Sequence, residues 1–171
     1  MEILKAYEDS VARDGHVRDP AQLDVIKRLE DLQRRIERRR PARTGLLSLF
    51  SRNRETHQFG VRGLYIWGGV GRGKTFLMDL FFESLNEDRK KRIHFHRMMH
   101  DVHDRLSAVG EIEDPLASVA ASIAAETRVL CFDEFFVSDI ADAMILGRLL
   151  EGLFAHGVTL ITTSNSAPDQ L

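Results

Sequence analysis

The sequence predicts an α/β fold in which helices cover both faces of a parallel sheet, giving a three-layer αβα core. Two observations carry this prediction. After Gly63, short apolar segments alternate with longer segments whose apolar residues recur at helical spacing. Before Gly63, the chain shows one long helical period and no strand pattern. Strands alternating with helices are typical of parallel sheets, because two parallel neighbours need a long crossover connection.

Length and composition fit one ordinary domain with a short additional arm. The chain has 171 residues, of which 43% are hydrophobic and 29% charged, the balance of a globular protein. Collagen-like, mucin-like and wholly disordered proteins are excluded. The single cysteine, Cys131, excludes an intramolecular disulfide and favours a reducing compartment. Because no signal peptide or membrane span is apparent, we expect a cytoplasmic protein with at most peripheral membrane contact.

Residues 1–60 are expected to form a basic helical arm and a connector. Asp19 is a helix cap, and Pro20 suits the first helical position. Apolar residues then recur every three or four positions, as an amphipathic helix requires: Leu23, Ile26, Leu29, Leu32 and Ile36. The helix is expected to end before Pro41, and residues 42–60 have no period. The core is therefore expected to occupy residues 61–171.

Four strands and four helices are predicted within this core. The strands are expected at residues 64–67, 92–96, 129–132 and 158–163, and the helices at 76–85, 98–109, 115–123 and 138–154. Asp114 and Pro115 start the third of these helices. Ser138 is expected to cap the last one, and Gly157 to end it.

The net charge of −2 conceals two segments of opposite sign. Between Lys27 and Arg54, ten basic residues face three acidic ones, whereas between Gly110 and Leu171 ten acidic residues face two basic ones. Segments of like charge are usually solvated surface. The alternative for the basic segment is an acidic partner, either nucleic acid or phospholipid.

Residues 68–75 match the phosphate-binding pattern G-x-x-x-x-G-K-[ST], placed between a predicted strand and a predicted helix. Glycines let backbone N–H groups turn toward an anion, and the helix start adds its positive end. Lys74 is expected to reach the terminal phosphates, and the Thr75 hydroxyl to bind Mg²⁺. The residues expected to contact the nucleotide are Gly68, Gly69, Val70, Gly71, Arg72, Gly73, Lys74, Thr75 and Phe76.

Two carboxylates follow the apolar run 129–132. Asp133 and Glu134 come at the carboxyl end of a predicted strand, the edge at which parallel α/β sheets bind ligands. We expect Asp133 to hold Mg²⁺ through water. Glu134 is expected to orient and activate the attacking water as a general base. The pattern therefore predicts two acids with different roles beside the phosphate loop.

The adjacent glutamate indicates which reaction the site performs. Transfer of phosphate to a small molecule needs no water-activating base, and the chain has no guanine-reading N-K-x-D pattern. We therefore expect ATP hydrolysis. Asn165, which follows the fourth predicted strand, is expected to hold the attacking water or the γ-phosphate from the opposite side. Its alternative role is that of an ordinary asparagine in a turn.

Several histidines surround the second predicted strand. His94, His96 or Arg97 is expected to hydrogen-bond Glu134 and to hold it inactive until a partner binds. The alternative is a metal site formed by His96, His100 and His103. That site is less favoured, because no cysteine and no H-E-x-x-H pattern accompanies the three histidines.

Strings of residues spread over most of the chain carry a resemblance to a known family. They are DPAQ at 19–22, GLYIWGGVGRGKT at 63–75, MDLF at 78–81, IHFH at 93–96, LCFDEFFVSDI at 130–140 and TSN at 163–165. These strings resemble the ZapE family of bacterial cell-division ATPases, which is related to the mitochondrial Lace-type AAA+ proteins. The string around the two carboxylates is far more specific than a generic acidic strand end.

The resemblance implies an AAA+ ATPase that uses ATP and Mg²⁺, releases ADP and acts on the FtsZ ring in the cytoplasm, with a homo-oligomer as an expected assembly. It also implies that strand 158–163 lies between strands 64–67 and 129–132. Family members continue into a fifth strand, an arginine finger and a helical lid. The sequence is accordingly expected to hold the catalytic part of a longer protein and to stop before that lid.

Two rival functions stay open. The first is a nucleic-acid-associated AAA+ protein, similar to a helicase loader, that would place residues 27–54 on phosphates. The second is a nucleotide-gated interaction module, in which ATP reshapes the loop at 135–137 and a partner reads that change without turnover. Both rivals keep the phosphate loop as the nucleotide site.

Overall fold

The computed structural model describes residues 3–14, 18–39, 60–110, 112–137 and 139–170. Among these residues, the two helices α1 (Ile3–Asp14) and α2 (Pro20–Arg38) precede the first strand. The core elements follow in the order β1 (Leu64–Trp67), α3 (Lys74–Ser84), β2 (Lys90–His94), α4 (Phe95–Val109), α5 (Pro115–Glu126), β3 (Val129–Asp133), α6 (Ile140–Ala155) and β4 (Thr159–Ser164). A short 3₁₀ turn, η2, occupies Pro168–Gln170.

The four strands form one parallel sheet in the order β1-β4-β3-β2. The predicted α/β class with a parallel sheet is confirmed, and so is the placing of β4 between β1 and β3. Trp67 pairs with Ser164, and His94 pairs with Asp133. The carboxyl ends of all four strands therefore meet along one edge of the sheet.

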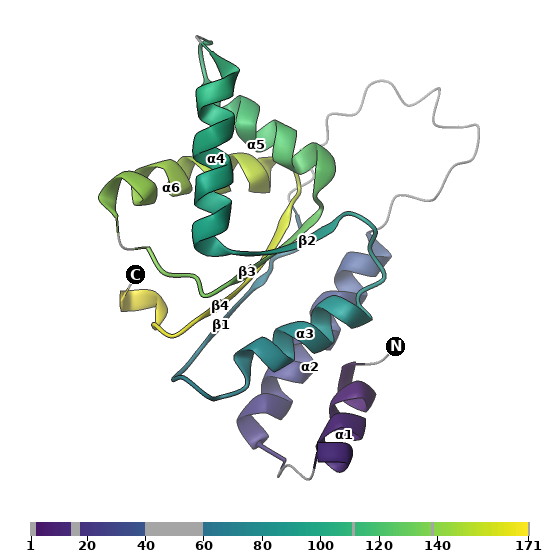
Figure 1. The fold of residues 1–171 in the computed structure, drawn as a ribbon. Coiled ribbons are helices and arrows are strands. Elements are labelled where there is room, and N and C mark those ends of the chain that lie inside the picture. Colours follow the sequence, from purple (N-terminus) through teal and green to yellow (C-terminus); the bar gives the residue numbers. More distant parts are fainter. Residues whose placement is uncertain (1–2, 15–17, 40–59, 111, 138, 171) are drawn as a thin grey trace, which may run out of the picture.

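Helices cover both faces of this sheet, with α1, α2 and α3 on one side and α4, α5 and α6 on the other (Figure 1). Side chains alternate across β3. Val129 and Cys131 enter the hydrophobic core on the side of α1, α2 and α3, called the first core. Leu130 and Phe132 enter the hydrophobic core on the side of α4, α5 and α6, called the second core. All five residues of β3 are buried. Asp133 shares the face of Cys131 and thus points toward the layer that contains α3.

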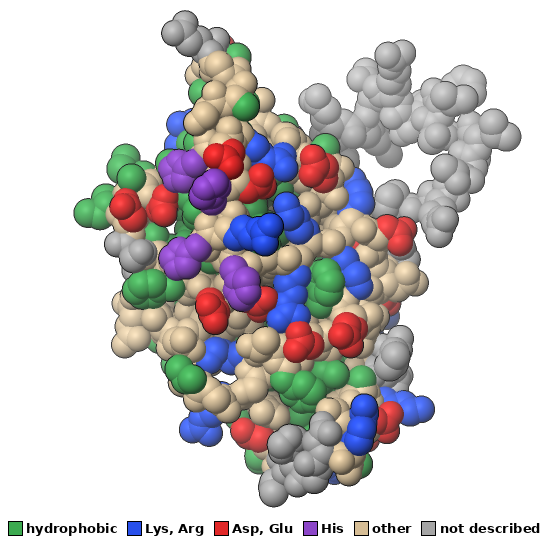
Figure 2. Space-filling model, in the orientation of Figure 1, with side chains coloured by type: hydrophobic (Ala, Val, Ile, Leu, Met, Phe, Trp, Pro, Cys, Tyr) green, Lys and Arg blue, Asp and Glu red, His purple; other side chains and the backbone are tan. Residues whose placement is uncertain are grey.

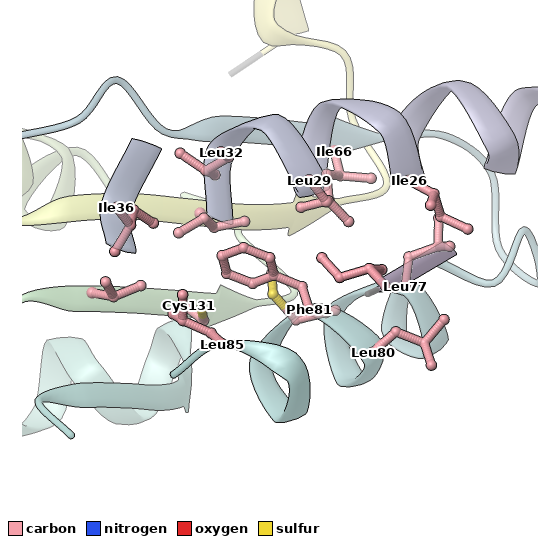
Figure 3. Close-up of a cluster of buried hydrophobic side chains, with 14 of the residues drawn as sticks. Ile26, Leu29, Leu32, Ile36, Ile66, Leu77, Leu80, Phe81, Leu85 and Cys131 are labelled. Atoms are coloured by element: carbon pink, nitrogen blue, oxygen red, sulfur yellow. The ribbon is translucent and has the colours of Figure 1, made fainter. Parts of the chain in front are cut away.

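The N-terminal helices are part of the first core. Asp19 caps α2 by accepting a hydrogen bond from the Ala21 N–H, as predicted. The apolar stripe of α2 lies against α3 and the sheet, and Figure 3 shows Ile26 and Leu29 above Phe81 of α3. Helix α1, which the sequence prediction missed, adds Ile3 and Tyr7 to the same core. Residues 40–59 lie outside the described ranges, so the domain division at residue 60 stays a prediction.

Several element boundaries differ from the prediction by one to three residues. Strand β2 ends at His94 rather than at residue 96, because Phe95 begins α4 and is buried against Phe132 and Phe135 of the second core. Helix α6 is capped by Asp139, which accepts from the Ala141 N–H; Ser138 lies outside the described residues. Gly157 has a φ of 81° but follows the C-cap residue, His156, by one position.

The basic charge of α2 is partly neutralised within the helix. Three of its arginines pair with acids one turn earlier: Arg28 with Asp24, Arg34 with Glu30, and Arg35 with Asp31. Such exposed pairs add little stability, but they reduce the local positive field. This arrangement fits the solvated-surface interpretation of the described part of the segment. No helix among the described residues has the length and apolar character needed to cross a membrane.

Burial of Cys131 in β3 predicts a pH dependence of stability. The side chain is fully buried, and burial raises the pKa of its thiol to about 12. The thiol ionises from an ordinary pKa of 9.0 in the unfolded chain but from a pKa of about 12 in the folded one. We therefore expect the contribution of the buried neutral thiol to the free energy of unfolding to be fully present below pH 9. That contribution should decline as the pH rises toward 12.

The measurement is the free energy of unfolding by urea between pH 8 and the most alkaline pH at which the chain still folds. Cys131→Ala should show a weaker decline than the unsubstituted chain over that range. Equal declines would mean that other groups account for the alkaline loss.

Candidate functional site

The loop between β1 and α3 has the backbone shape that an anion site needs. Gly68, Gly71 and Gly73 have φ angles of 152°, 78° and 77°, which L side chains rarely adopt. A Cβ added at Gly68, Gly69 or Gly71 would meet no atom within 4 Å, so the inner surface of the loop is open. Helix α3 begins directly after this loop, at Lys74, so its N-terminal N–H groups face the same space.

Lys74 folds back over the loop that precedes it. Its ammonium group donates to the carbonyl oxygens of Gly68 and Gly69, at 2.7 and 2.8 Å. An ammonium group has three N–H donors, so one remains for an anion. The positive charge is thereby held above the glycine backbone.

The N-terminal helices brace this loop from the other side. The Gln22 side chain donates to the carbonyl of Arg72 at 3.1 Å, and its own oxygen accepts from the Tyr7 hydroxyl at 3.1 Å. Tyr7 is fully buried. A Cβ on Gly73 would come within 2.6 Å of the Gln22 amide. The pattern match at residues 68–75 did not reveal this contact, in which Gln22 reaches Arg72 across 50 positions.

Glu134 sits in a strained turn at the end of β3. Its φ of 54° is unusual for a residue with a side chain. Two hydrogen bonds to Thr163 of β4 hold the turn: the Glu134 N–H donates to the Thr163 hydroxyl at 3.2 Å, and the Phe135 N–H donates to the Thr163 carbonyl at 2.7 Å. The turn leaves the Glu134 side chain exposed while Asp133 and Phe135 on either side are buried.

Ser164, at the end of β4, connects the neighbouring loops. Its carbonyl accepts from the Gly68 N–H at 3.3 Å, which fixes the start of the phosphate loop. Its hydroxyl donates to the Phe135 carbonyl at 2.7 Å and accepts from the Ser166 N–H at 3.1 Å. The loops after β1, β3 and β4 are therefore bonded to one buried residue.

A cleft of about 400 Å³ lies where these loops meet. Its lining combines the phosphate loop with the ends of β3 and β4: Val70, Gly71, Arg72, Gly73, Lys74, Thr75, Phe76, Glu134, Thr163, Ser164 and Asn165. The predicted base, Glu134, and the predicted sensor, Asn165, thus face the same cleft as Lys74 and Thr75. Asp133 is not part of this lining.

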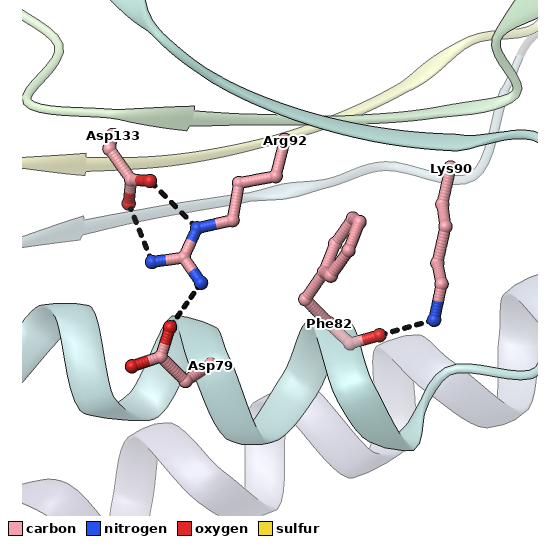
Figure 4. A network of polar contacts seen from close by, with 5 residues as sticks. All are labelled: Asp79, Phe82, Lys90, Arg92 and Asp133. Atoms are coloured by element: carbon pink, nitrogen blue, oxygen red, sulfur yellow. Dashed lines mark hydrogen bonds and ion pairs between the residues drawn. The ribbon is translucent and has the colours of Figure 1, made fainter.

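Asp133 is instead engaged by Arg92 of β2 (Figure 4). The Arg92 Nε donates to Oδ2 of Asp133 at 2.7 Å, and Nη2 donates to Oδ1 at 3.2 Å. The remaining nitrogen, Nη1, donates to Oδ1 of Asp79 on α3. Burial lowers the pKa of Arg92, but the hydrogen bonds to Asp133 and Asp79 outweigh burial and raise that pKa above its ordinary value.

The oxygen groups at this edge fit a hard divalent cation. Thr75 offers a hydroxyl at the start of α3, and Asp133 offers a carboxylate at the adjacent strand end. Hydroxyl and carboxylate oxygens, with water completing the shell, are the ligands that Mg²⁺ accepts. The donor set therefore suits Mg²⁺ better than a softer metal, which would need histidine or cysteine.

A protein-family model described as AFG1-like ATPase matches residues 1–171. The chain belongs to the AFG1-like ATPase family. Among its relatives, the cell division protein ZapE of Escherichia coli strain K12 is 48% identical over 172 residues, which cover 96% of this chain and 46% of that protein. Lactation elevated protein 1 homolog B of Danio rerio is 49% identical over 121 residues, covering 64% of this chain and 24% of that protein.

This AFG1-like chain thus spans 46% of the length of ZapE. It covers 24% of the Danio rerio protein. Its fold is also similar to that of solved structures. AMPPCP-bound DnaA from Aquifex aeolicus aligns over 92% of this chain and 43% of its own, with a TM-score of 0.60 and 13% identity. DnaI aligns over 90% of this chain and 71% of its own, with a TM-score of 0.52 and 16% identity. At these identities the likeness establishes the fold alone.

The histidines of the AFG1-like chain do not occupy the roles expected of them. Figure 2 shows histidine side chains gathered on the face over α4, next to acidic and basic ones. His100 pairs with Asp104, and His103 with Asp142. Among the described residues, no group of three or more His, Cys, Asp or Glu side chains could hold a metal ion. The alternative metal site at His96, His100 and His103 is therefore wrong.

The expected restraint on Glu134 is also absent from the structure. His94, His96 and Arg97 are exposed, and no hydrogen bond or ion pair in the described part of the chain joins them to Glu134. The basic group that contacts a site carboxylate is Arg92, and the carboxylate is Asp133 rather than its neighbour. Arg92 carried no motif signal; its position in the same strand pattern, two residues before His94, was the only indication.

Proposed function

We propose that the chain binds ATP together with Mg²⁺ and hydrolyses the bond between its β- and γ-phosphates. The observation that carries this proposal is the shared cleft, in which the phosphate loop, Glu134 and Asn165 line one volume. Membership of the AFG1-like ATPase family supports it. A cleft lined only by N–H groups that bind phosphate would favour nucleotide binding without turnover. A carboxylate on the opposite side of the cleft favours hydrolysis.

The phosphate side of the cleft would bind and orient ATP. The backbone N–H groups of residues 70–75 would surround the β- and γ-phosphates, and the third N–H of Lys74 would contact the terminal phosphate oxygens. Thr75 and Asp133 would hold Mg²⁺, Asp133 through water. When bound, Mg²⁺ neutralises charge that develops on the phosphate oxygens.

The opposite side of the cleft would supply the water. Glu134 would accept a proton from the attacking water as that water approaches the γ-phosphorus in line with the leaving oxygen. Asn165, at the end of β4, would hydrogen-bond the same water or a γ-phosphate oxygen. The two hydrogen bonds that Thr163 accepts from the Glu134 and Phe135 N–H groups would keep the Glu134 turn in place during this step.

The biological setting is proposed from the relatives. The 48% identity to the cell division protein ZapE supports a role in division, with FtsZ as the protein acted upon and the cytoplasm as the compartment. A homo-oligomer is the proposed assembly. Because the chain spans 46% of ZapE, the activity and partners of the complete protein belong to this proposal as well.

Lys74→Ala tests the binding half of the proposal. We expect the affinity for Mg-ATP to fall at least tenfold, because the variant loses a charge-assisted contact to the phosphates. Isothermal titration calorimetry on the purified chain measures the dissociation constant directly.

Lys27→Ala is the matched control, since Lys27 is an exposed lysine of α2 outside the cleft. It should leave the dissociation constant unchanged. Equal affinities for the unsubstituted chain and Lys74→Ala would contradict a nucleotide site at this loop.

A further inference from the structure

We propose that Arg92 is a positioning residue for the metal-side carboxylate, holding Asp133 in one orientation relative to the phosphate-loop helix, with Asp79 as its second anchor. The inference rests on the proposed function, because it assigns Asp133 to Mg²⁺. It adds two residues, Asp79 on α3 and Arg92 on β2, that act together with Asp133 on β3.

The contact between Arg92 and Asp133 restricts the carboxylate in two directions. Two guanidinium nitrogens meet the two carboxylate oxygens, at 2.7 and 3.2 Å, so rotation of the carboxylate would break both bonds. Both side chains are mostly enclosed, with 19% of Arg92 and 11% of Asp133 exposed. Each carboxylate oxygen keeps a further lone pair, so the pairing leaves Asp133 able to bind a metal-held water.

Asp79 connects this pair to the phosphate loop. Thr75 and Asp79 are four residues apart on α3 and therefore lie on one face of that helix, one turn apart. Arg92 joins Asp79 by its third nitrogen. The guanidinium thus spans from the strand end that carries Asp133 to the helix that carries Thr75, as Figure 4 shows for Asp79 and Asp133.

Strand β2 depends more on this attachment to α3 than an inner strand would. In the part of the chain that the structure describes, it lies at the edge of the sheet and pairs only with β3. A second residue on the same face, Lys90, donates to the carbonyls of Phe82 and Leu85 at the end of α3. Arg92 and Lys90 therefore fix β2 to two points along α3, and Arg92 is the point next to the site.

Only arginine can make this set of contacts. Its planar fork presents donors on three nitrogens at once, in a geometry that matches a carboxylate. Lysine carries the same charge at a single point and cannot hold both oxygens of Asp133 while it contacts Asp79. A role that depends on orientation should therefore be lost in Arg92→Lys, whereas a role that depends on charge alone should survive.

The test measures how much Mg²⁺ the chain needs to bind nucleotide tightly. A ribose-labelled fluorescent ATP analogue is titrated at rising free Mg²⁺, and the midpoint concentration is compared between variants. For Arg92→Met we expect the midpoint to rise about tenfold, the scale on which residues behind a metal ligand act. Arg92→Lys should resemble Arg92→Met, and affinity in EDTA should be unchanged in both.

Two further variants separate positioning from general stability. Arg128→Met removes another enclosed pair, Arg128 with Glu87, at the opposite end of β3, and should leave the midpoint unchanged. Asp79→Asn leaves the Arg92–Asp133 contact in place and should raise the midpoint by less than Arg92→Met does. Asp79→Asn also carries the test alone if Arg92→Met fails to unfold cooperatively in urea.

Each outcome bears on one proposal or the other. A midpoint that is unchanged or lowered in Arg92→Met would overturn the positioning role, and a lowered one would show that Arg92 competes with the metal. Full rescue by Arg92→Lys would overturn the dependence on orientation. If the unsubstituted chain shows no Mg²⁺-dependent affinity, the proposed function fails first and the inference falls with it.

Discussion

Glu134→Gln is expected to stop ATP hydrolysis while ATP stays bound. The carboxamide has the shape of the carboxylate but cannot accept the proton of the attacking water, and loss of a general base lowers rates about 10²- to 10⁴-fold. The turn should survive the change, because the bonds that hold it use the backbone N–H groups of Glu134 and Phe135. The phosphate loop, on the other side of the cleft, is untouched.

The measurement is a single-turnover assay with the chain in excess over radiolabelled ATP, which detects slow hydrolysis. Binding of Mg-ATP is measured in parallel by calorimetry. Glu151→Gln, an exposed position on α6, is the matched control and should keep the full rate. Turnover by Glu134→Gln at the rate of the unsubstituted chain would remove Glu134 from the role of base.

Phe81→Ala should lower the free energy of unfolding by about 3–5 kcal/mol, the range for truncating a large buried aromatic side chain. Phe81 is fully buried among other apolar groups, with 0% of its surface accessible to water. It belongs to the core that joins α2, α3 and the sheet, together with Leu29 and Cys131 (Figure 3). The cavity left by this truncation would remove contacts with α2, α3 and the sheet at once.

Urea unfolding followed by circular dichroism gives this free energy. Phe154→Ala is the matched control, because Phe154 is 40% exposed and should lose far less. Phe81→Leu keeps most of the volume and should fall between the two, which keeps the comparison measurable if Phe81→Ala does not fold. Similar losses in Phe81→Ala and Phe154→Ala would contradict the central place given to Phe81.

The parts of the fold and the candidate site that depend on local sequence could be predicted. The phosphate loop is specified by glycines whose positive φ angles are needed where they stand. The end of β3 is specified by an apolar run that stops at two acids. Because parallel strands end at one edge, the meeting of Glu134 and Asn165 in one cleft could be anticipated from strand order.

The parts that depend on distant pairs could not be predicted. Arg92 reaches Asp133 across 41 positions, and Gln22 reaches Arg72 across 50; no local period records either contact. Helix α1 was missed because its apolar residues, such as Ile3 and Tyr7, form a stripe too short to stand out without the core that receives it. The end of β2 was misplaced because Phe95 suits both a strand and the buried face of α4.

The position of Ser164 has a consequence for how the site responds to a displacement of its strands. Three loops of unrelated sequence are tied to this one residue, and β4, which carries it, is flanked by strands on both sides. Alignment of the phosphate loop with Glu134 is therefore set by a common reference in an inner strand of the sheet. A small displacement of β4 would move all three loops together and preserve their spacing. Loss of the Ser164 hydroxyl would release the loops after β3 and β4, whereas the phosphate loop would stay bonded to the Ser164 carbonyl.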